Sequence, residues 1–310
     1  MQELSPISVI GDNSNPYAGR VWRRTFPHGE FEAVYKSHAK APGEVERINT
    51  WLQTSGSDNR VTARALFGAS LPSDSPKVQT ESNDARSVRR ARQKLRWAIK
   101  CIGADRLLTL TFRDNVTDYA QADAALTRFI NMCKREWPTA WQFTAVPEIQ
   151  ESRAATTGFR VWHFHLALRG WWNIKKLRGF WYRALGCRVI WSADGSPVLA
   201  DQSVTPGSVN ISDPKRGGRG RRVWAVASIA SYLAKYVGKS MASEDLGGKP
   251  SYRSTRGLHP VVERFLVKAL TFADVLVCFL DLVSPSGVAT PFLWQSKDRS
   301  CLWSAGQVSP

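Results

Sequence analysis

Two histidines separated by one residue, His163 and His165, lie in the run WHFHLAL, which is rich in β-forming residues. Alternate side chains of a strand point to the same face, so both imidazoles are expected to project together, with Cα atoms roughly 7 Å apart. Imidazoles at this spacing can converge on one metal ion. The pair therefore predicts a strand and a candidate metal site, although such pairs are more often half-buried side chains of a sheet.

Two tyrosines, Tyr232 and Tyr236, lie about seventy residues later in the run SYLAKYVGKS. Residues four apart share one face of a helix, and Lys235 and Lys239 each follow a tyrosine by three positions. A buried stripe is predicted on the adjacent side of this helix, at Ile229, Leu233 and Val237. Helical tyrosines usually serve packing, but a pair beside a metal site would offer two nucleophilic hydroxyls.

Basic residues exceed acidic ones by 43 to 26, which gives a formal net charge of +17 and favours a polyanionic partner, with nucleic acid as the first candidate. Two segments concentrate this charge: a helix predicted to begin at Asp84, and the glycine-rich run PKRGGRGRR at 214–222. Solvated surface would explain either segment equally well. The candidate phosphate contacts are Arg89, Arg90, Lys215, Arg216, Arg219, Arg221 and Arg222.

The five cysteines are scattered and form no CxxC pair, so neither a zinc ribbon nor a disulfide framework is predicted. This pattern fits a reducing compartment, and we expect a cytoplasmic protein. The first residues lack the basic and apolar segments of a signal peptide. The apolar run 269–283 is too short for a membrane span and contains Asp274 and Asp281, so it is predicted to be a buried element.

The order of predicted elements indicates an α+β fold, an antiparallel sheet with flanking helices. Residues 1–83 are predicted to be an N-terminal extension that is partly flexible, 84–245 the catalytic domain, and 246–310 a C-terminal extension without an assigned role. The predicted strands are 107–112, 141–149, 159–168 and 208–212, and the predicted helices after the one at Asp84 are 121–137, 174–185 and 225–239. The second and third strands would form a hairpin.

The third metal ligand is predicted to be Glu148, because it is the only carboxylate among the alternate residues of the strand before the histidines. The hairpin register is open from sequence, so Gln150 and Glu151 remain alternatives. A nitrogen and oxygen donor set fits Mg²⁺ or Mn²⁺, and zinc is also compatible with it.

These groups together suggest cleavage of a DNA phosphodiester by a tyrosine. A phenol has an ordinary pKa near 10, so its attack needs help. A divalent cation would polarise the phosphoryl oxygens, and Lys235 and Lys239 would steady the phosphate or the phenolate. The product would be a covalent phosphotyrosine and a free 3′-OH.

Three runs, in order, resemble the motifs of the HUH (His-hydrophobe-His) endonucleases that initiate rolling-circle replication. LLTLTF at 107–112 is similar to the first strand motif, WHFHLAL at 162–168 to the metal-binding motif, and SYLAKYVGKS at 231–240 to the two-tyrosine motif of microvirus-type replication A proteins. The run VPEIQESR at 146–153 resembles the segment before the histidines and supports Glu148.

The resemblance covers roughly residues 84–245. It implies a five-stranded antiparallel sheet of the HUH and ferredoxin-like type, with His163 and His165 as ligands and Tyr232 and Tyr236 as alternating nucleophiles. It further implies nicking of a single-stranded phage origin, attachment to the 5′ end, and action in the cytoplasm of a bacterial host. No helicase motif follows and no GxxxxGK[ST] run is present, so a host helicase and DNA polymerase are implied as partners.

Three other functions are compatible with parts of the pattern. A transposase or plasmid relaxase of the same family would use the same chemistry, although such transposases often carry one tyrosine. A non-catalytic single-stranded DNA-binding protein would use charge and aromatic rings without a metal. A metal hydrolase of small molecules would make no use of the positive charge.

Overall fold

The computed structural model describes residues 17–37, 83–201, 204–212, 226–241, 246, 248–269, 271–283, 292–296 and 301–307. The chain divides into two compact units. Residues 81–260 form the central unit, and residues 1–80 together with 261–310 form the terminal unit. The sequence analysis treated the two ends as separate extensions, whereas strands from both ends share one sheet in the structure.

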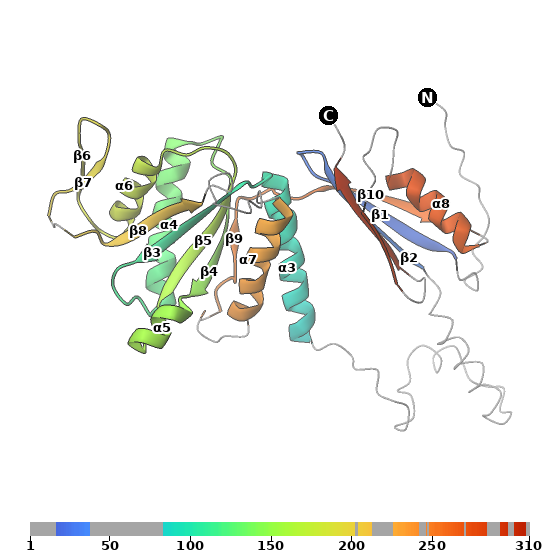
Figure 1. The fold of residues 1–310 in the computed structure, drawn as a ribbon, viewed down its shortest axis with the longest axis horizontal. Helices are drawn as coiled ribbons and strands as arrows, with labels where there is room; N and C mark the ends of the chain where they lie inside the picture. The colour runs from blue at the N-terminus through green and yellow to red at the C-terminus, as the bar shows by residue number, and fades with distance from the viewer. Residues whose placement is uncertain are drawn as a thin grey trace, which may run out of the picture. The chain divides into compact units, whose positions relative to one another are not determined.

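The central unit contains a five-stranded antiparallel sheet in the order β8-β3-β5-β4-β9 (Figure 1). Its strands are β3 (Arg106–Phe112), β4 (Thr144–Ile149), β5 (Trp162–Leu168), β8 (Gly207–Ser212) and β9 (Arg253–Ser254). The predicted α+β class and the antiparallel hairpin of β4 and β5 are confirmed. A separate two-stranded hairpin, β6 (Val189–Trp191) and β7 (Pro197–Leu199), was not predicted.

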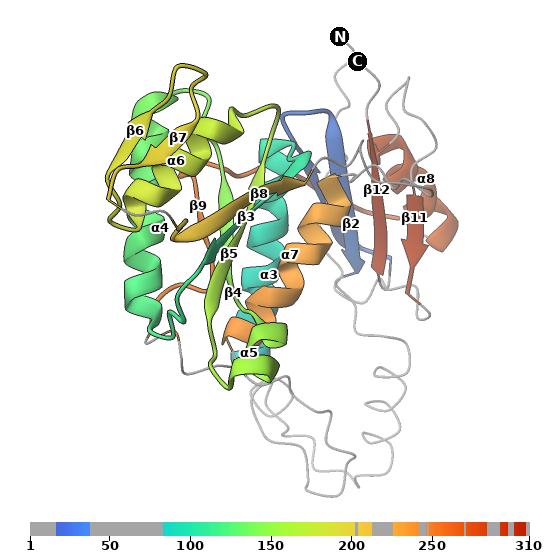
Figure 2. The ribbon, with the colours of Figure 1, turned by 60° about the vertical axis from the view of Figure 1, so that its left-hand side comes forward.

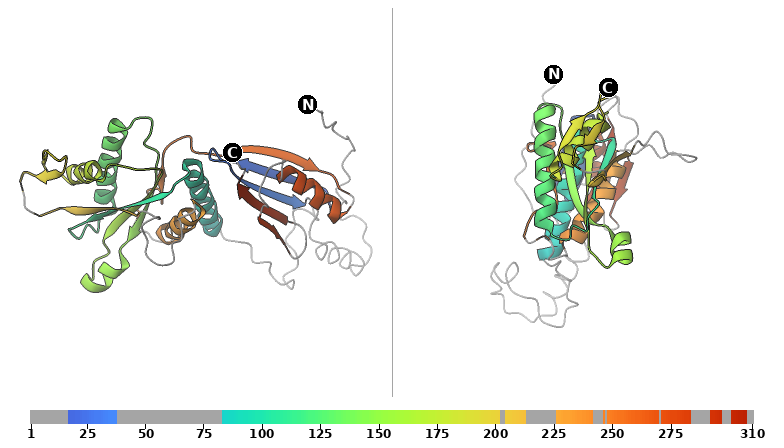
Figure 3. Two further views of the ribbon diagram at one scale, coloured as in Figure 1. Left: turned by 45° about the horizontal axis from the view of Figure 1, so that its top comes forward. Right: turned by 90° about the vertical axis from the view of Figure 1, so that its left-hand side faces the viewer.

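Helices cover both faces of the central sheet (Figure 3). On one face, Leu108, Phe164 and Leu166 pack with α4 (Tyr119–Glu136) and α6 (Ile174–Ala184). On the other face, Val146 and Ala167 pack with α3 (Asn83–Ile102) and α7 (Val226–Met241). Alternation along the strands therefore places His163 and His165 on the face that α3 and α7 cover.

The helix boundaries follow local capping and burial. The side chain of Asp118 accepts hydrogen bonds from the backbone N–H groups of Ala120 and Gln121, so α4 begins at Tyr119. α3 begins at Asn83, which places the predicted cap residue Asp84 in the first turn. The predicted stripe of α7 is confirmed, since its three members are fully buried: Ile229, Leu233 and Val237.

A short helix, α5 (Glu151–Thr157), occupies the polar connection between β4 and β5. It has no buried residue and no side-chain hydrogen bond at its N-cap. Its anchor comes from elsewhere in the chain: the Arg153 guanidinium donates to the carbonyl of Phe112 at 2.8 Å and to that of Arg113. Gly158, with φ 76°, ends the helix.

The terminal unit is built around a second antiparallel sheet, in the order β10-β1-β2-β12-β11. One face of it carries the helix α8 and a core that includes Val21, Phe31, Tyr35 and Phe279. The elements are β1 (Gly19–Thr25), β2 (Glu30–Ser37), β10 (Val261–Val267), α8 (Phe272–Val283), β11 (Phe292–Gln295) and β12 (Cys301–Gln307).

The apolar run near residue 270 forms α8, which buries one side against the terminal sheet through Val275, Phe279 and Val283. It has 12 residues, and Val277 on its other side is exposed. Within the ranges that the structure describes, no helix combines the length and apolar character needed to cross a membrane.

Candidate metal centre and tyrosine helix

Three side chains of the hairpin converge on the face of the central sheet that α7 covers. Glu148 on β4 lies directly opposite His163 on β5. The Glu148 Oε2 atom is 3.0 Å from His163 Nε2 and 2.7 Å from His165 Nε2, and these two nitrogens are 3.1 Å apart. Each histidine is only 7% exposed. The three residues, called the triad below, form a donor cluster that excludes most water.

The donor set of the triad fits a divalent cation. One ligand atom from each residue lies within 4.8 Å of the other two, so a single ion can contact all three. Burial alone would raise the pKa of Glu148, but hydrogen bonds and positive charge from the two histidines lower that pKa to about 2. The carboxylate is therefore anionic at neutral pH, as a metal ligand must be.

The structure also separates Glu148 from its two alternatives. Gln150 is the N-cap of α5, and Glu151 lies in the first turn of that helix. The Glu151 carboxylate is exposed and pairs with Lys239 Nζ at 2.6 Å. Among these three candidates, Glu148 alone joins the histidines in the triad.

Thr109 on β3 supports His165 from behind. Its Oγ1 lies 3.0 Å from His165 Nδ1, and the two residues are directly opposite each other in the sheet. With the Nδ1 proton donated to this hydroxyl, Nε2 keeps its lone pair for a metal ion. The sequence placed Thr109 on the polar side of its strand, but only the pairing of β3 with β5 connects it with the metal centre.

Replacing Thr109 by valine is expected to weaken Mn²⁺ binding about 10- to 100-fold, the usual contribution of a group that orients a ligating histidine. Valine keeps the branched shape but cannot accept the Nδ1–H hydrogen bond. Calorimetric titration of Mn²⁺ would measure the loss. Thr111→Val is the matched control, because Thr111 lies on the same strand but bonds Ser208 Oγ at 2.7 Å. Equal losses in both variants would remove the role given to Thr109.

Both tyrosines of α7 lie beside the triad. The ring centroids of Tyr232 and Tyr236 are 5.7 and 5.6 Å from that of His165, and 5.1 Å from each other. The buried stripe fixes this orientation, because it holds α7 against the sheet and α3 (Figure 2). Both rings are partly exposed, so a substrate can approach them.

Tyr236 is protonated at neutral pH in the metal-free site. Burial is the largest cause that raises the pKa of its hydroxyl, followed by the hydrogen bond with Tyr232 and the negative charge of Glu148. A cation held by the triad would offset the charge of Glu148 and so favour the phenolate.

A hollow of about 270 Å³ adjoins the triad, and its lining includes Glu148, Tyr236, Lys239 and Arg160. Lys239 reaches it from the last turn of α7, as the tandem spacing suggested. Lys235 is exposed on the same helix. Arg160 was not singled out from the sequence, because only the fold of α5 onto the end of β5 brings it to the hollow.

The structure describes two of the seven predicted phosphate contacts. Arg89 and Arg90 are exposed on α3, the helix that packs beside α7. The remaining five lie outside the described residues: Lys215, Arg216, Arg219, Arg221 and Arg222.

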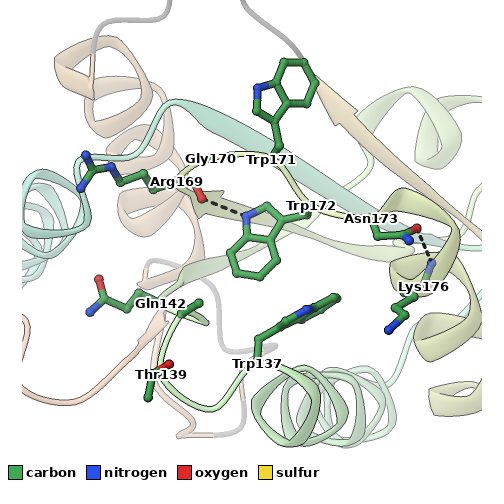
Figure 4. Close-up of a pocket in the computed structure, with 10 residues that line it drawn as sticks. Trp137, Thr139, Gln142, Arg169, Gly170, Trp171, Trp172, Asn173 and Lys176 are labelled. Carbon is green, nitrogen blue, oxygen red and sulfur yellow. Dashed lines mark hydrogen bonds between the residues drawn. The ribbon is translucent and has the colours of Figure 1, made fainter.

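A second hollow, of about 570 Å³, lies beyond the opposite end of β5 and contains none of the predicted site residues (Figure 4). Trp137 and Trp172 line it, and their ring centroids are 5.0 Å apart at an interplanar angle of 69°. Trp172 also contacts Trp141, with centroids 4.9 Å apart. These indoles pack against one another, so the cluster is explained by core packing.

Comparison with known families locates the similarity of this chain in the central unit. Residues 105–241 match the family model for replication-associated proteins of the ORF2 type. The matched region runs from the start of β3 to the end of α7, and it includes the triad and both tyrosines. Neither the curated proteins nor the solved structures contain a match. The central unit is thus similar to replication-associated proteins, in agreement with the resemblance to rolling-circle initiators.

Proposed function

We propose that this chain is a metal-dependent enzyme that nicks and rejoins single-stranded origin DNA to initiate rolling-circle replication. The observation that carries the proposal is the position of Tyr232 and Tyr236, each with its ring within 5.7 Å of the His165 ring of the triad. The family match over residues 105–241 supports a role in replication. Residues 84–245 are proposed as the catalytic domain.

The chemistry that follows is a transesterification at phosphorus. The hydroxyl oxygen of one tyrosine attacks the phosphorus, the bond from phosphorus to the 3′ oxygen breaks, and that oxygen takes up a proton while the tyrosine proton passes to solvent. The DNA is left with a 5′-phosphotyrosine and a 3′-OH. Attack of a 3′-OH on the phosphotyrosine reverses the step, releases the tyrosine and joins the strand.

His163, His165 and Glu148 would hold a Mg²⁺ or Mn²⁺ ion, which supplies Lewis-acid polarisation of the phosphoryl oxygens. Thr109 fixes the ring of His165, and the buried stripe of α7 fixes the tyrosines near the same point. Lys239, at the hollow beside Tyr236, is placed to contact a phosphate oxygen, and Lys235 is proposed to do the same from the exposed side of α7.

The two tyrosines allow the DNA strand to be passed between them. Their rings lie 5.1 Å apart and both approach His165, so one tyrosine can hold a 5′ end while the other attacks a second phosphodiester. Such alternation would release a unit-length circle. We propose that the exposed Arg89 and Arg90 guide the DNA, and that a host helicase and polymerase separate and extend the strands in the cytoplasm.

Metal removal tests the proposal. Incubation with origin-like single-stranded DNA and Mn²⁺ is expected to give a protein–DNA adduct that survives denaturing electrophoresis, and EDTA is expected to abolish it. A non-catalytic DNA-binding protein would instead bind the DNA and leave it whole in both conditions. Sustained adduct formation in EDTA would contradict the role of the triad. A transposase or relaxase would form the same adduct but would not need both tyrosines.

A further inference from the structure

The terminal sheet has a second face that no helix of its own unit covers within the described residues. α8 packs on the face that contains Val21, Phe31 and Leu302 (Figure 1). Alternation along the strands sends their neighbours to the other face, called the open face below. The open face is defined by the row that runs through Trp22, Val34, Trp303 and Trp294.

This row places three indoles across the sheet. Trp22 lies opposite Val34, Val34 opposite Trp303, and Trp303 opposite Trp294. Trp294 is 50% exposed. Phe292, which is 63% exposed, contacts Trp303 with ring centroids 5.6 Å apart. Large aromatic side chains that stay accessible on a sheet face are typical of a binding surface.

Three cations gather at one end of the row. Arg20 lies directly opposite Lys36, and Arg264 lies on the next strand, opposite Trp22. All three are exposed, and none of them makes an ion pair with another described residue. Like charges directly opposite each other destabilise a sheet. The Arg24–Glu32 pair, by contrast, shows the opposite charges that favour folding.

Rows of aromatic rings beside unpaired cations match the chemistry of single-stranded nucleic acid. Exposed indoles stack on unpaired bases, whereas bases in a duplex are already stacked on each other. Phosphates supply the anions that Arg20, Lys36 and Arg264 lack within the described part of the fold. An apolar protein partner would account for the indoles but would leave the three cations next to one another without an anion.

We propose that the open face of the terminal sheet is a second binding surface for single-stranded DNA, separate from the metal centre. Bases would stack on Trp22, Trp303 and Trp294, and the backbone phosphates would contact the cations. The choice of DNA over RNA rests on the proposed function, and the stacking and charge do not depend on it. The surface would hold single-stranded DNA while the central unit acts on the scissile phosphate.

Fluorescence anisotropy of the full chain with a labelled thirty-nucleotide oligo-dT, in EDTA so that no strand is cut, tests this surface. Trp294→Ala is expected to weaken binding at least about fivefold, the lower limit for loss of one stacked base. The double variant Arg20→Gln, Arg264→Gln is expected to reduce the slope of log affinity against log salt by about 1.4, since each phosphate contact on a single strand contributes about 0.7.

Arg23→Gln is the matched control, because Arg23 lies on the same strand as Arg20 but on the α8 side, where it pairs with Glu263. It should leave the salt slope unchanged. Thermal unfolding of each variant checks the fold. Affinities within twofold of the parent for both open-face variants would overturn the inference, and so would Trp294→Ala dissociating an oligomer in sedimentation. Tighter binding of oligo-U, lost in the same variants, would overturn the choice of DNA.

Adduct formation with Mn²⁺, measured at saturating DNA, separates this inference from the proposed function. The open-face variants should form adduct at the parental rate once the DNA is saturating. If the parent forms no adduct while the variants lose oligo-dT affinity, the nicking proposal fails and the binding surface stands. Normal adduct formation with unchanged affinity would leave the opposite result.

Discussion

Replacing Glu148 by glutamine is expected to lower the rate of adduct formation more than about 100-fold, because even groups that only orient a ligand contribute 10- to 100-fold. Glutamine keeps the shape of the side chain, but it offers a neutral oxygen or an N–H group where the triad requires an anionic oxygen. The loss should appear as weaker Mn²⁺ binding in calorimetry and as slower adduct formation at any fixed Mn²⁺ concentration.

Glu151→Gln is the matched control, because it makes the same chemical change three residues away, at the other carboxylate considered from the sequence. Glu151 is exposed and pairs with exposed Lys239, and such surface pairs contribute little to stability. We expect adduct rates within a few-fold of the parent. If Glu151→Gln lost more activity than Glu148→Gln, the assignment of the third ligand would be wrong.

The double variant Tyr232→Phe, Tyr236→Phe is expected to form no detectable adduct. Phenylalanine keeps both rings against His165, so the packing of α7 is retained while both attacking oxygens are removed. Each single variant keeps one nucleophile, and we expect at least one of them to nick DNA but to fail in the second transfer that releases a joined circle. Single-turnover assays with end-labelled DNA separate these two steps.

Tyr252→Phe serves as the control for this series, since Tyr252 is another partly buried tyrosine that packs against the same core cluster. It should form adduct at the parental rate. An undiminished adduct in the double variant would exclude both proposed nucleophiles, whatever the metal dependence.

Much of the central unit was predictable because its elements carry strong local patterns. The strands 107–112 and 208–212 and the helices at 174–185 and 225–239 agree with β3, β8, α6 and α7 to within one or two residues at each end. Helix α5 was not predicted as a helix. It buries nothing, and it is held by contacts from Arg153 to carbonyls about forty residues away, which no local pattern reveals.

The candidate site was predictable where alternation fixed the geometry. The spacing of His163 and His165 placed both on one face, and the same rule selected Glu148 on β4. The register that sets Glu148 opposite His163 depends on tertiary pairing, as does the support of His165 by Thr109. The position of Arg160 at the hollow likewise depends on a fold that the sequence did not specify locally.

The terminal sheet was not predicted, because its strands pair across most of the chain. β1 pairs with β10, and β2 pairs with β12, so the partners are separated by more than 200 residues. The alternation of Phe31, Ala33 and Tyr35 in β2 is visible in the sequence, but a lone alternating run surrounded by polar residues does not identify its neighbours.

The central claim is that the triad activates two neighbouring tyrosines toward one DNA strand, and the mass of the nucleotide-linked peptide tests it most directly. Trypsin cuts after Arg222, Lys235 and Lys239, which places Tyr232 and Tyr236 on separate peptides. We expect Mn²⁺-dependent adducts in which a 5′ phosphate is joined to one of these two tyrosines. Attachment to any other residue, or through a 3′ phosphate, would contradict the account.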